Sequence, residues 1–211
     1  MRIRIFIAAF VVLLTTAVRA DQFGLDVAQS KDTVYFRSTA QLEFIEGKTN
    51  VIAGSITVDP SNISADAGGI LQCDLQTLKT GIDMRDEHMR DRYLHTEKYP
   101  YAYFELKSVS GLPASLQPGT AYQGTAIGYF YIHGGKRQIT APLTVTLHKL
   151  GDTQSLTTKA TFTIKLDDYG IERPKAIFMK LAETIEIEVV FNAINGVAST
   201  PISLPNWPEL K

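Results

Sequence analysis

The chain has 211 residues, 45% of them hydrophobic, with 21 basic and 22 acidic side chains and a formal net charge of −1. This length is enough for one domain with its own core. The balanced charge, without a basic stripe, argues against nucleic acid as a partner. The one cysteine, Cys73, excludes an intramolecular disulfide, so the fold must be stabilised by its core alone.

The first 20 residues have the pattern of a secretory signal peptide. Arg2 and Arg4 give a basic start, residues 6–14 form a short apolar run, and small residues precede Asp21. The run is shorter than the about 20 residues that span a bilayer. We expect cleavage after Ala20 and a periplasmic or secreted bacterial protein. Removal of three arginines leaves 21 − 3 = 18 basic and 22 acidic residues, a formal charge of −4.

Alternation of apolar and polar residues dominates the chain from Thr33 onward. This period of two predicts antiparallel sheet with one dry and one wet face. No long amphipathic helix alternates with the strands, which argues against a parallel βαβ sheet. Eight strands are expected, at residues 33–42, 51–58, 70–75, 102–109, 122–132, 143–147, 160–166 and 185–191.

Eight antiparallel strands in one domain form either a sandwich or a closed barrel. The barrel is favoured because a Cys/Trp/Cys framework is missing and because the small residues Gly54, Gly124, Ala126 and Gly128 fall at positions expected to face inward. Small inward residues leave space for a slender ligand. We therefore predict an all-β, eight-stranded antiparallel barrel over residues 21–195. A Pro-rich irregular tail, residues 196–211, should lie on its surface or fray.

A charged insert, residues 78–104, interrupts the strand pattern. Its middle, residues 86–94, fits a short helix that ends before Tyr99-Pro100. On such a helix His88, Asp91 and His95 would share one face and could ligate zinc or supply a general base. The spacing lacks the His pair and intervening Glu of a metalloprotease, so no metal is expected. A plainer interpretation is a set of ion pairs on a solvated surface.

The insert could instead be a lid over an amphiphile. Guanidinium groups suit phosphate or carbonyl head groups, and methionine adapts to slender apolar ligands. Head-group and lid residues would be Met84, Arg85, Asp86, His88, Met89, Arg90, Arg92 and Tyr93. Lumen residues, chosen by their inward strand positions, would be Phe36, Ile52, Gly54, Ile56, Leu71, Leu75, Phe104, Leu106, Gly124, Gly128, Phe130, Leu143, Val145, Phe162, Ile164 and Ile187.

Catalytic motifs are scarce. No G-x-S-x-G occurs, Gly134-Gly135 is typical of a hairpin turn and not of a phosphate-binding loop, and Cys73 alternates with Leu71 and Leu75 as a small buried hydrophobe. We expect no catalytic residue and no cofactor. An enzyme with His88 as acid/base, oriented by Asp86 or Asp91, remains the alternative.

Several short segments resemble the YceI-like family of bacterial secreted proteins. The most specific are Met84–Met89, with the pattern R-D-x-H-M, and Lys98-Tyr99-Pro100; the resemblance extends over residues 33–194. It implies a lipocalin-like barrel with a short helical insert that carries a long isoprenoid or similar amphiphile. The G-x-W of true lipocalins is absent, and Gly135-Lys136-Arg137-Gln138 departs from the family's usual turn.

The resemblance thus implies a bound isoprenoid or quinone-like lipid. Because the competing state of such a lipid is the equally apolar bilayer, we expect a carrier that exchanges it with membranes through transient contact. A quinone-delivering partner of membrane redox proteins is a second function that the sequence does not separate from the first. Whether the barrel forms a homodimer is left open by the sequence.

Overall fold

The computed structural model describes residues 21–25, 32–39, 44–63, 67–173, 175–176, 179–180, 182–199 and 201–210. The predicted signal peptide, residues 1–20, lies outside the described residues. Among the helices of the described ranges, none is long and apolar enough to cross a membrane.

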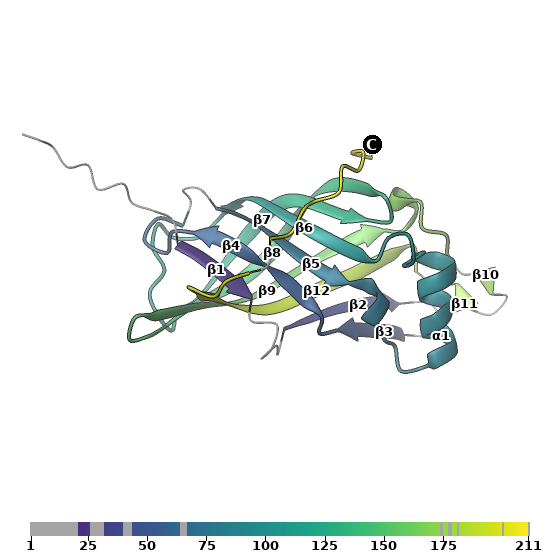
Figure 1. Cartoon of the computed structure of the whole chain (residues 1–211), viewed down its shortest axis with the longest axis horizontal. Coiled ribbons are helices and arrows are strands. Elements are labelled where there is room, and N and C mark those ends of the chain that lie inside the picture. The colour runs from purple at the N-terminus through teal and green to yellow at the C-terminus, as the bar shows by residue number, and fades with distance from the viewer. Residues whose placement is uncertain are drawn as a thin grey trace, which may run out of the picture.

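Antiparallel strands make up most of the fold, as the alternating sequence predicts (Figure 1). The strands are β1 (Asp21–Leu25), β2 (Thr33–Thr39), β3 (Phe44–Thr49), β4 (Ile52–Val58), β5 (Gly68–Asp74), β6 (Tyr101–Ser110), β7 (Ala121–Ile132), β8 (Gly135–Leu150), β9 (Thr153–Lys165), β10 (Lys175–Ala176), β11 (Met179–Lys180) and β12 (Thr184–Asn195). The helical segments are η2 (Leu75–Thr77), α1 (Asp83–His88), η3 (Met89–Tyr93) and η4 (Asp167–Tyr169).

The sheet closes into a barrel through β1, which pairs with both β4 and β12. β1 and β2 pair in succession with the same strand, since Phe23 lies opposite Asn195 and Val34 lies opposite Val189. In the same way, β3 pairs with β2, and β4 pairs with β1. These four short strands therefore form two interrupted barrel strands, and the predicted eight-stranded antiparallel barrel is confirmed. The sequence had not indicated β1, β3 or the interruptions.

One end of the barrel is sealed by what we call the floor, the residues Ile63, Leu112 and Leu116. The loop after β4 and the loop after β6 are tied together there, because Ile63 N donates to Ala114 O at 3.1 Å and Leu116 N donates to Pro60 O at 2.9 Å. Ile63 and Leu116 are buried in a cluster that also contains Phe23 and Leu156. Apolar burial and paired backbone groups thus close this end.

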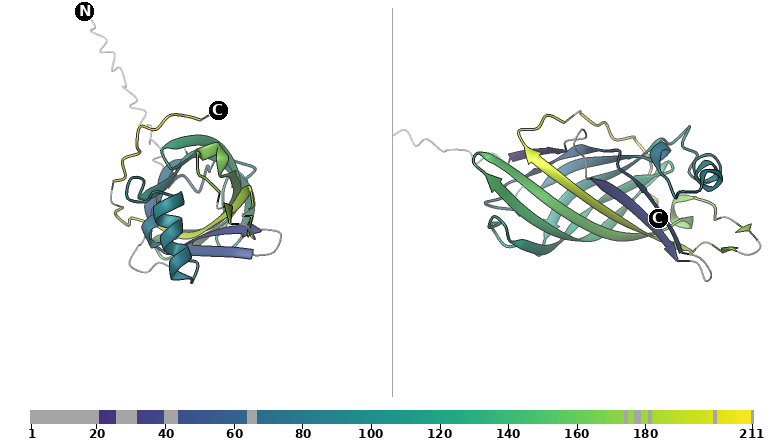
Figure 2. Two further views of the ribbon diagram at one scale, coloured as in Figure 1. Left: turned by 90° about the vertical axis from the view of Figure 1, so that its right-hand side faces the viewer. Right: turned by 90° about the horizontal axis from the view of Figure 1, so that it is seen from below.

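The opposite end is the mouth, where the insert predicted from the sequence lies. Figure 2 (left) looks into this end along the barrel, with α1 lying across the rim. The β7–β8 turn and the segment from η4 to β12 reach the same end. We call residues 78–100 the lid. Its first stem is joined to β3 by a backbone pair, because Lys48 N donates to Lys79 O at 2.8 Å and Lys79 N to Lys48 O at 3.0 Å.

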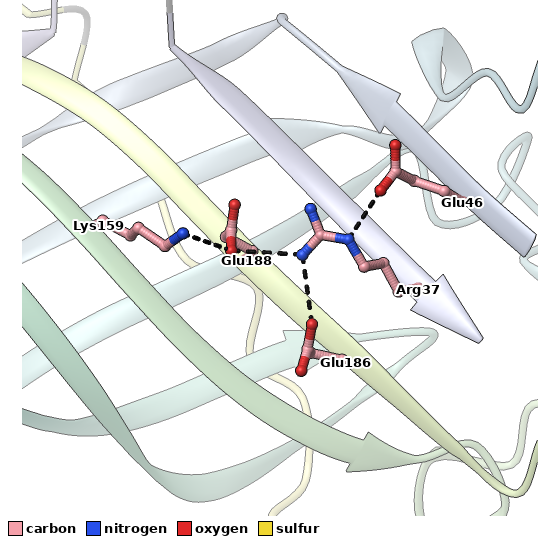
Figure 3. A network of polar contacts seen from close by, with 5 residues as sticks. All are labelled: Arg37, Glu46, Lys159, Glu186 and Glu188. Atoms are coloured by element: carbon pink, nitrogen blue, oxygen red, sulfur yellow. Dashed lines mark hydrogen bonds and ion pairs between the residues drawn. The ribbon is translucent and has the colours of Figure 1, made fainter. Parts of the chain in front are cut away.

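An ion-pair network on the outer wall joins four strands (Figure 3). Arg37 on β2 bonds Glu46 at 2.7 Å and lies 3.3 Å from both Glu186 and Glu188 of β12. Lys159 on β9 meets Glu188 at 2.8 Å. Lys159 and then Arg37 hold the pKa of the Glu188 carboxyl below its usual value. The network holds the short β2–β3 hairpin against the longer strands.

The Pro-rich tail runs along the outside of the barrel toward the mouth (Figure 1). Its end is attached to β8, because Lys136 N donates to Pro208 O at 3.0 Å and Leu210 N donates to Lys136 O at 2.8 Å. Trp207 packs against Tyr99 and Tyr103, with ring centroids 5.6 and 6.2 Å apart. The tail therefore covers an aromatic part of the outer wall.

Candidate functional site

A cavity of about 580 Å³ occupies the barrel lumen between the floor and the mouth. Inward side chains of all the long strands line it, and nearly all of them are apolar. Each predicted lumen residue other than the three glycines lines this cavity: Phe36, Ile52, Ile56, Leu71, Leu75, Phe104, Leu106, Phe130, Leu143, Val145, Phe162, Ile164 and Ile187.

The three glycines do not open the lumen, contrary to the expectation from sequence. A Cβ built on Gly124 would lie 2.6 Å from the Leu112 side chain, and one on Gly128 would lie 2.8 Å from the Phe104 ring. At Gly54, with φ of 145°, a Cβ would meet the β5 backbone, 2.9 Å from the Cα of Leu71. Neighbouring groups already fill the space beside each glycine, so these residues permit close packing.

Alanines supply the space that the glycines do not. Ala102, Ala126, Ala141 and Ala160 all line the cavity, and Ala126 lies directly opposite Ala141 in the β7–β8 ladder. Their inward positions follow from the same strand alternation as those of Phe130 and Leu143. Ala126 and Ala160 had been placed on the inward, apolar side of their strands, and Ala102 and Ala141 could have been placed there too, because they alternate in step with Phe104 and Leu143.

Cys73 also lines the cavity and is buried. Burial, followed by the neighbouring Asp74 carboxylate, raises the pKa of its thiol to about 12. A thiol that stays protonated at neutral pH is a poor nucleophile. The interpretation of Cys73 as a small buried hydrophobe therefore agrees with its surroundings.

The lid crosses the mouth as α1 followed directly by the π-helix η3. Because the helix changes its winding after His88, the residues that follow do not continue the spacing expected of an α-helix. Met84, Arg85, His88, Met89 and Tyr93 line the cavity, as does Leu94, which was expected to turn inward with Met84, Met89 and Tyr93. The other three predicted lid residues do not line it: Asp86, Arg90 and Arg92.

Asp86 is buried and serves the structure of the lid. Its Oδ1 accepts hydrogen bonds from Thr80 N at 2.8 Å and from the Thr80 hydroxyl. Arg85 Nε donates to the same Thr80 hydroxyl at 2.8 Å. Asp86 thus fastens the start of α1 to the first lid stem, and these hydrogen bonds run to Thr80 and not to His88. Arg85 reaches the cavity while its Nε is held in place.

The second lid stem is fastened by a histidine pair. His95 Nδ1 and His133 Nε2 are 2.8 Å apart, the two rings are stacked, and His133 Nδ1 lies 3.0 Å from Tyr169 O. Burial is the main cause that lowers the pKa of His133, and His95 and Lys98 lower it further. Neutral His133 can donate from Nδ1 to Tyr169 O and accept from His95, which suits a structural contact.

The predicted face of His88, Asp91 and His95 is not formed. His88 lines the cavity, Asp91 is exposed, and His95 has a φ of 48° beyond the helical segment. Within the part of the chain that the structure describes, no three His, Cys, Asp or Glu side chains are grouped so that they could hold a metal ion.

Polar groups gather where the cavity meets the mouth. Thr80, Arg85 and His88 from the lid and Glu172 from the segment after η4 line this end. Thr158, a buried hydroxyl, lies on the cavity wall farther down. A ligand with an apolar tail and one polar head fits this division, since only the mouth offers charged hydrogen-bond donors and acceptors.

Solved structures with the same fold support the description of the barrel. BcnA of Burkholderia cenocepacia shares 20% identity, with 80% of this chain and 99% of that chain covered and a TM-score of 0.64. A polyisoprenoid binding domain from Saccharophagus degradans shares 20% identity over 83% and 99% of the two chains, with a TM-score of 0.65. The Campylobacter jejuni YCEI protein shares 17% identity over 77% and 88%, with a TM-score of 0.59.

No curated protein matches this chain. The model of one protein family, described as the YceI-like domain, matches residues 15–193, which include every strand of the barrel except the last two residues of β12. The chain belongs to the YceI-like domain family.

Proposed function

We propose that this protein is a periplasmic or secreted lipid carrier that holds an amphiphile with its tail in the lumen and its head at the mouth. The observation that carries the proposal is the apolar cavity whose charged groups gather at one end. The similar Saccharophagus degradans domain is described as polyisoprenoid binding, which supports an isoprenoid or related lipid as the ligand class.

The physics of transfer favours an exchanging carrier. Each buried CH₂ gains about 0.8 kcal/mol on leaving water, so a long lipid is practically never free in solution. Its competing state is a bilayer, which is as apolar as the lumen. The preference between protein and membrane is therefore small and depends on the head group and on the fit of the tail.

Side chains at the rim suit transient contact with a membrane. Three large hydrophobic residues are exposed at the mouth: Phe44 at the start of β3, and Ile82 and Met84 of the lid. Ile82 and Met84 also line the cavity, so the apolar surface is continuous from the rim into the lumen. A lipid leaving a bilayer could pass over these side chains without crossing water.

The test is to fill the lumen with a larger side chain. Ala141 lines the cavity, whereas Ala121, on the neighbouring strand β7, is exposed and does not line it. Ala141→Phe should abolish co-purification of lipid, and Ala121→Phe, the same chemical change on the outer face, should preserve it. Native mass spectrometry of both variants and of the wild type measures the occupancy, and far-UV circular dichroism checks the fold.

Equal lipid occupancy in a folded Ala141→Phe variant would contradict the proposal, as would a wild-type protein that takes up no lipid from vesicles. Extraction of the bound molecule also separates the ligand classes, because a quinone is recognised by its mass and by its redox-dependent absorbance.

A further inference from the structure

The Pro-rich tail is docked on the barrel at a defined place. The family match ends before it, so the tail is an addition to the shared barrel. Lys136 N donates to Pro208 O at 3.0 Å, and Leu210 N donates to Lys136 O at 2.8 Å. The Leu210 side chain packs against the barrel core and occupies the space beside Gly135. The end of the tail is therefore attached to β8 near the mouth, and we call residues 201–210 the strap.

Trp207 of the strap contacts three tyrosine rings. Its ring centroid lies 6.2 Å from that of Tyr103 on β6 and 6.5 Å from that of Tyr131 on β7. The third ring, at 5.6 Å and an interplanar angle of 88°, is that of Tyr99, which belongs to the second stem of the lid. Edge-to-face ring pairs add stability beyond the burial of their area. Trp207 therefore joins the lid to two strands of the wall.

The sequence around Trp207 limits the entropy that the strap loses on docking. Pro205 and Pro208 flank the ring, and each fixes one backbone dihedral angle before the strap meets the barrel. Trp207 N also donates to Pro205 O at 2.9 Å. A few contacts are therefore enough to keep this ring in place.

Tyr99 connects the strap to the histidine pair. Its ring meets the His133 ring edge on, with centroids 5.1 Å apart, and His133 stacks with His95. Tyr99 N and Lys98 N both donate to His95 O at 2.9 Å. The strap, Tyr99 and the histidine pair thus pack one against the next at the second stem, whereas the hydrogen bonds that fasten the first stem run to β3 and within the lid.

We propose that Trp207 is a positioning residue that holds the second stem of the lid closed, so that the strap sets how fast lipid enters and leaves the mouth. This inference rests on the proposed function and adds the regulation of its site. None of the described strap residues lines the cavity, so the strap acts on the lid and not on the lipid. A contact that stabilises the closed lid equally with and without lipid slows entry and exit alike and leaves the preference between protein and membrane unchanged.

Transfer of a fluorescent isoprenoid to vesicles tests the inference. Protein loaded with retinol is mixed with phosphatidylcholine vesicles that contain NBD-phosphatidylethanolamine, which quenches the retinol emission on arrival. Trp207→Ala removes the ring contact with Tyr99 and should speed transfer by about 2- to 12-fold, the equivalent of about 0.5–1.5 kcal/mol at 1.4 kcal/mol per tenfold. The share of retinol bound at equilibrium should stay the same.

Two further strap variants serve as controls. Trp207→Phe retains an aromatic ring and should bring the transfer rate back toward that of the wild type. Ile202→Ala truncates the strap at its other end, where Ile202 lies beside Ser55, Gly69 and Ile70 of β4 and β5, and should leave the rate unchanged.

The route through Tyr99 has its own test. A Trp207→Ala, Tyr99→Ala double variant should transfer retinol no faster than Tyr99→Ala alone, because the two rings act as one unit. Hydrogen exchange gives a readout that needs no lipid. The amides of Lys98 and Tyr99 should exchange faster in Trp207→Ala, while those of Ile63 and Leu116 at the floor stay unchanged.

The possible outcomes separate the strap from the carrier function. A folded Trp207→Ala variant with the transfer rate and the second-stem exchange of the wild type would overturn the strap while the carrier function stands. Equal acceleration in Ile202→Ala would overturn the positioning role of Trp207, because the tail would then support the wall as a whole. A wild type that takes up neither retinol nor phospholipid would overturn the carrier function and the effect on transfer, and hydrogen exchange alone would then decide whether Trp207 holds the lid.

Discussion

The two ends of the barrel are closed by different kinds of interaction. At the floor, Ile63 and Leu116 are 2% and 4% exposed, and backbone hydrogen bonds connect their loops. At the mouth, Ile82 and Met84 are 52% and 68% exposed, polar contacts fasten the two stems of the lid, and Leu78 at its first stem belongs to the core. Polar contacts near water contribute little net stability, whereas buried apolar side chains contribute much. The exposed rim of the mouth should therefore contribute less to stability than the floor.

Truncation of a buried side chain at the floor should lower the stability of the protein most. Leu116→Ala removes a fully buried side chain and should lower the free energy of unfolding by about 2–5 kcal/mol. Met84→Ala, at the exposed rim, should change it by less than about 0.5 kcal/mol. Urea denaturation followed by circular dichroism measures both. Equal losses at the two ends would refute the contrast between floor and mouth.

Removal of the Asp86 carboxylate, which fastens the lid, should destabilise the lid alone. Asp86→Ala leaves Thr80 N without its carboxylate acceptor and should cost the lid about 1.5–3 kcal/mol, the usual range for a hydrogen bond to a charged group. Hydrogen exchange of residues 80–94 should accelerate while exchange at the floor loops stays unchanged. Glu87→Ala, one residue along and exposed, is the control. Faster exchange at both ends would mean that Asp86 supports the whole barrel.

The histidine pair should give the smallest effect and a dependence on pH. His133→Asn, which tolerates the φ of 54° at this position, should cost about 1 kcal/mol at neutral pH through the lost contacts with His95 and Tyr169. The folded-state pKa of His133 lies below its ordinary value of 6.5. The unfolded chain then binds more protons, so this contribution is present above pH 6.5 and is lost as the pH falls toward the folded-state pKa.

Urea denaturation of the wild type and of His133→Asn over a series of pH values measures this contribution. The difference between the two proteins should shrink on acidification, since Lys98 and His95 beside the ring oppose its protonation. A difference that stays constant or grows would show that His133 is not kept neutral by its surroundings.

Strand alternation was sufficient to predict the antiparallel sheet and most of the residues that line the lumen, whereas the choice of a barrel over a sandwich depended on other features of the sequence. Leu143 and Val145 of β8 and Phe162 and Ile164 of β9 face inward as their period of two indicates. The same rule failed for the glycines, because parity gives the direction of a side chain and says nothing about which neighbour fills the space above it. Leu112, which fills the space beside Gly124, lies in a loop outside any alternating run.

The lid was predicted less well, for reasons of local geometry. Arg90 and Arg92 were expected to face a head group, but the π-helical turn after His88 shifts them away from the cavity. The pairing of His95 with His133 depends on two residues with positive φ in separate loops, and no sequence period signals it. Asp86 and Thr80, six residues apart, could have been recognised as a local hydrogen-bonded loop, since short acidic and hydroxyl side chains often bond nearby backbone groups.

The pairing of β1 with β12 has a consequence for how fast the protein folds. Phe23, near the start of the described chain, lies opposite Asn195, so the barrel cannot close until nearly the whole polypeptide is available. Contacts between residues this distant in sequence must overcome a large loss of chain entropy before they stabilise anything. Proteins dominated by such pairings fold in about milliseconds to seconds. Closure of the barrel should be the slow step, and the unpaired edges of β1 and β12 stay available to other chains until it is complete.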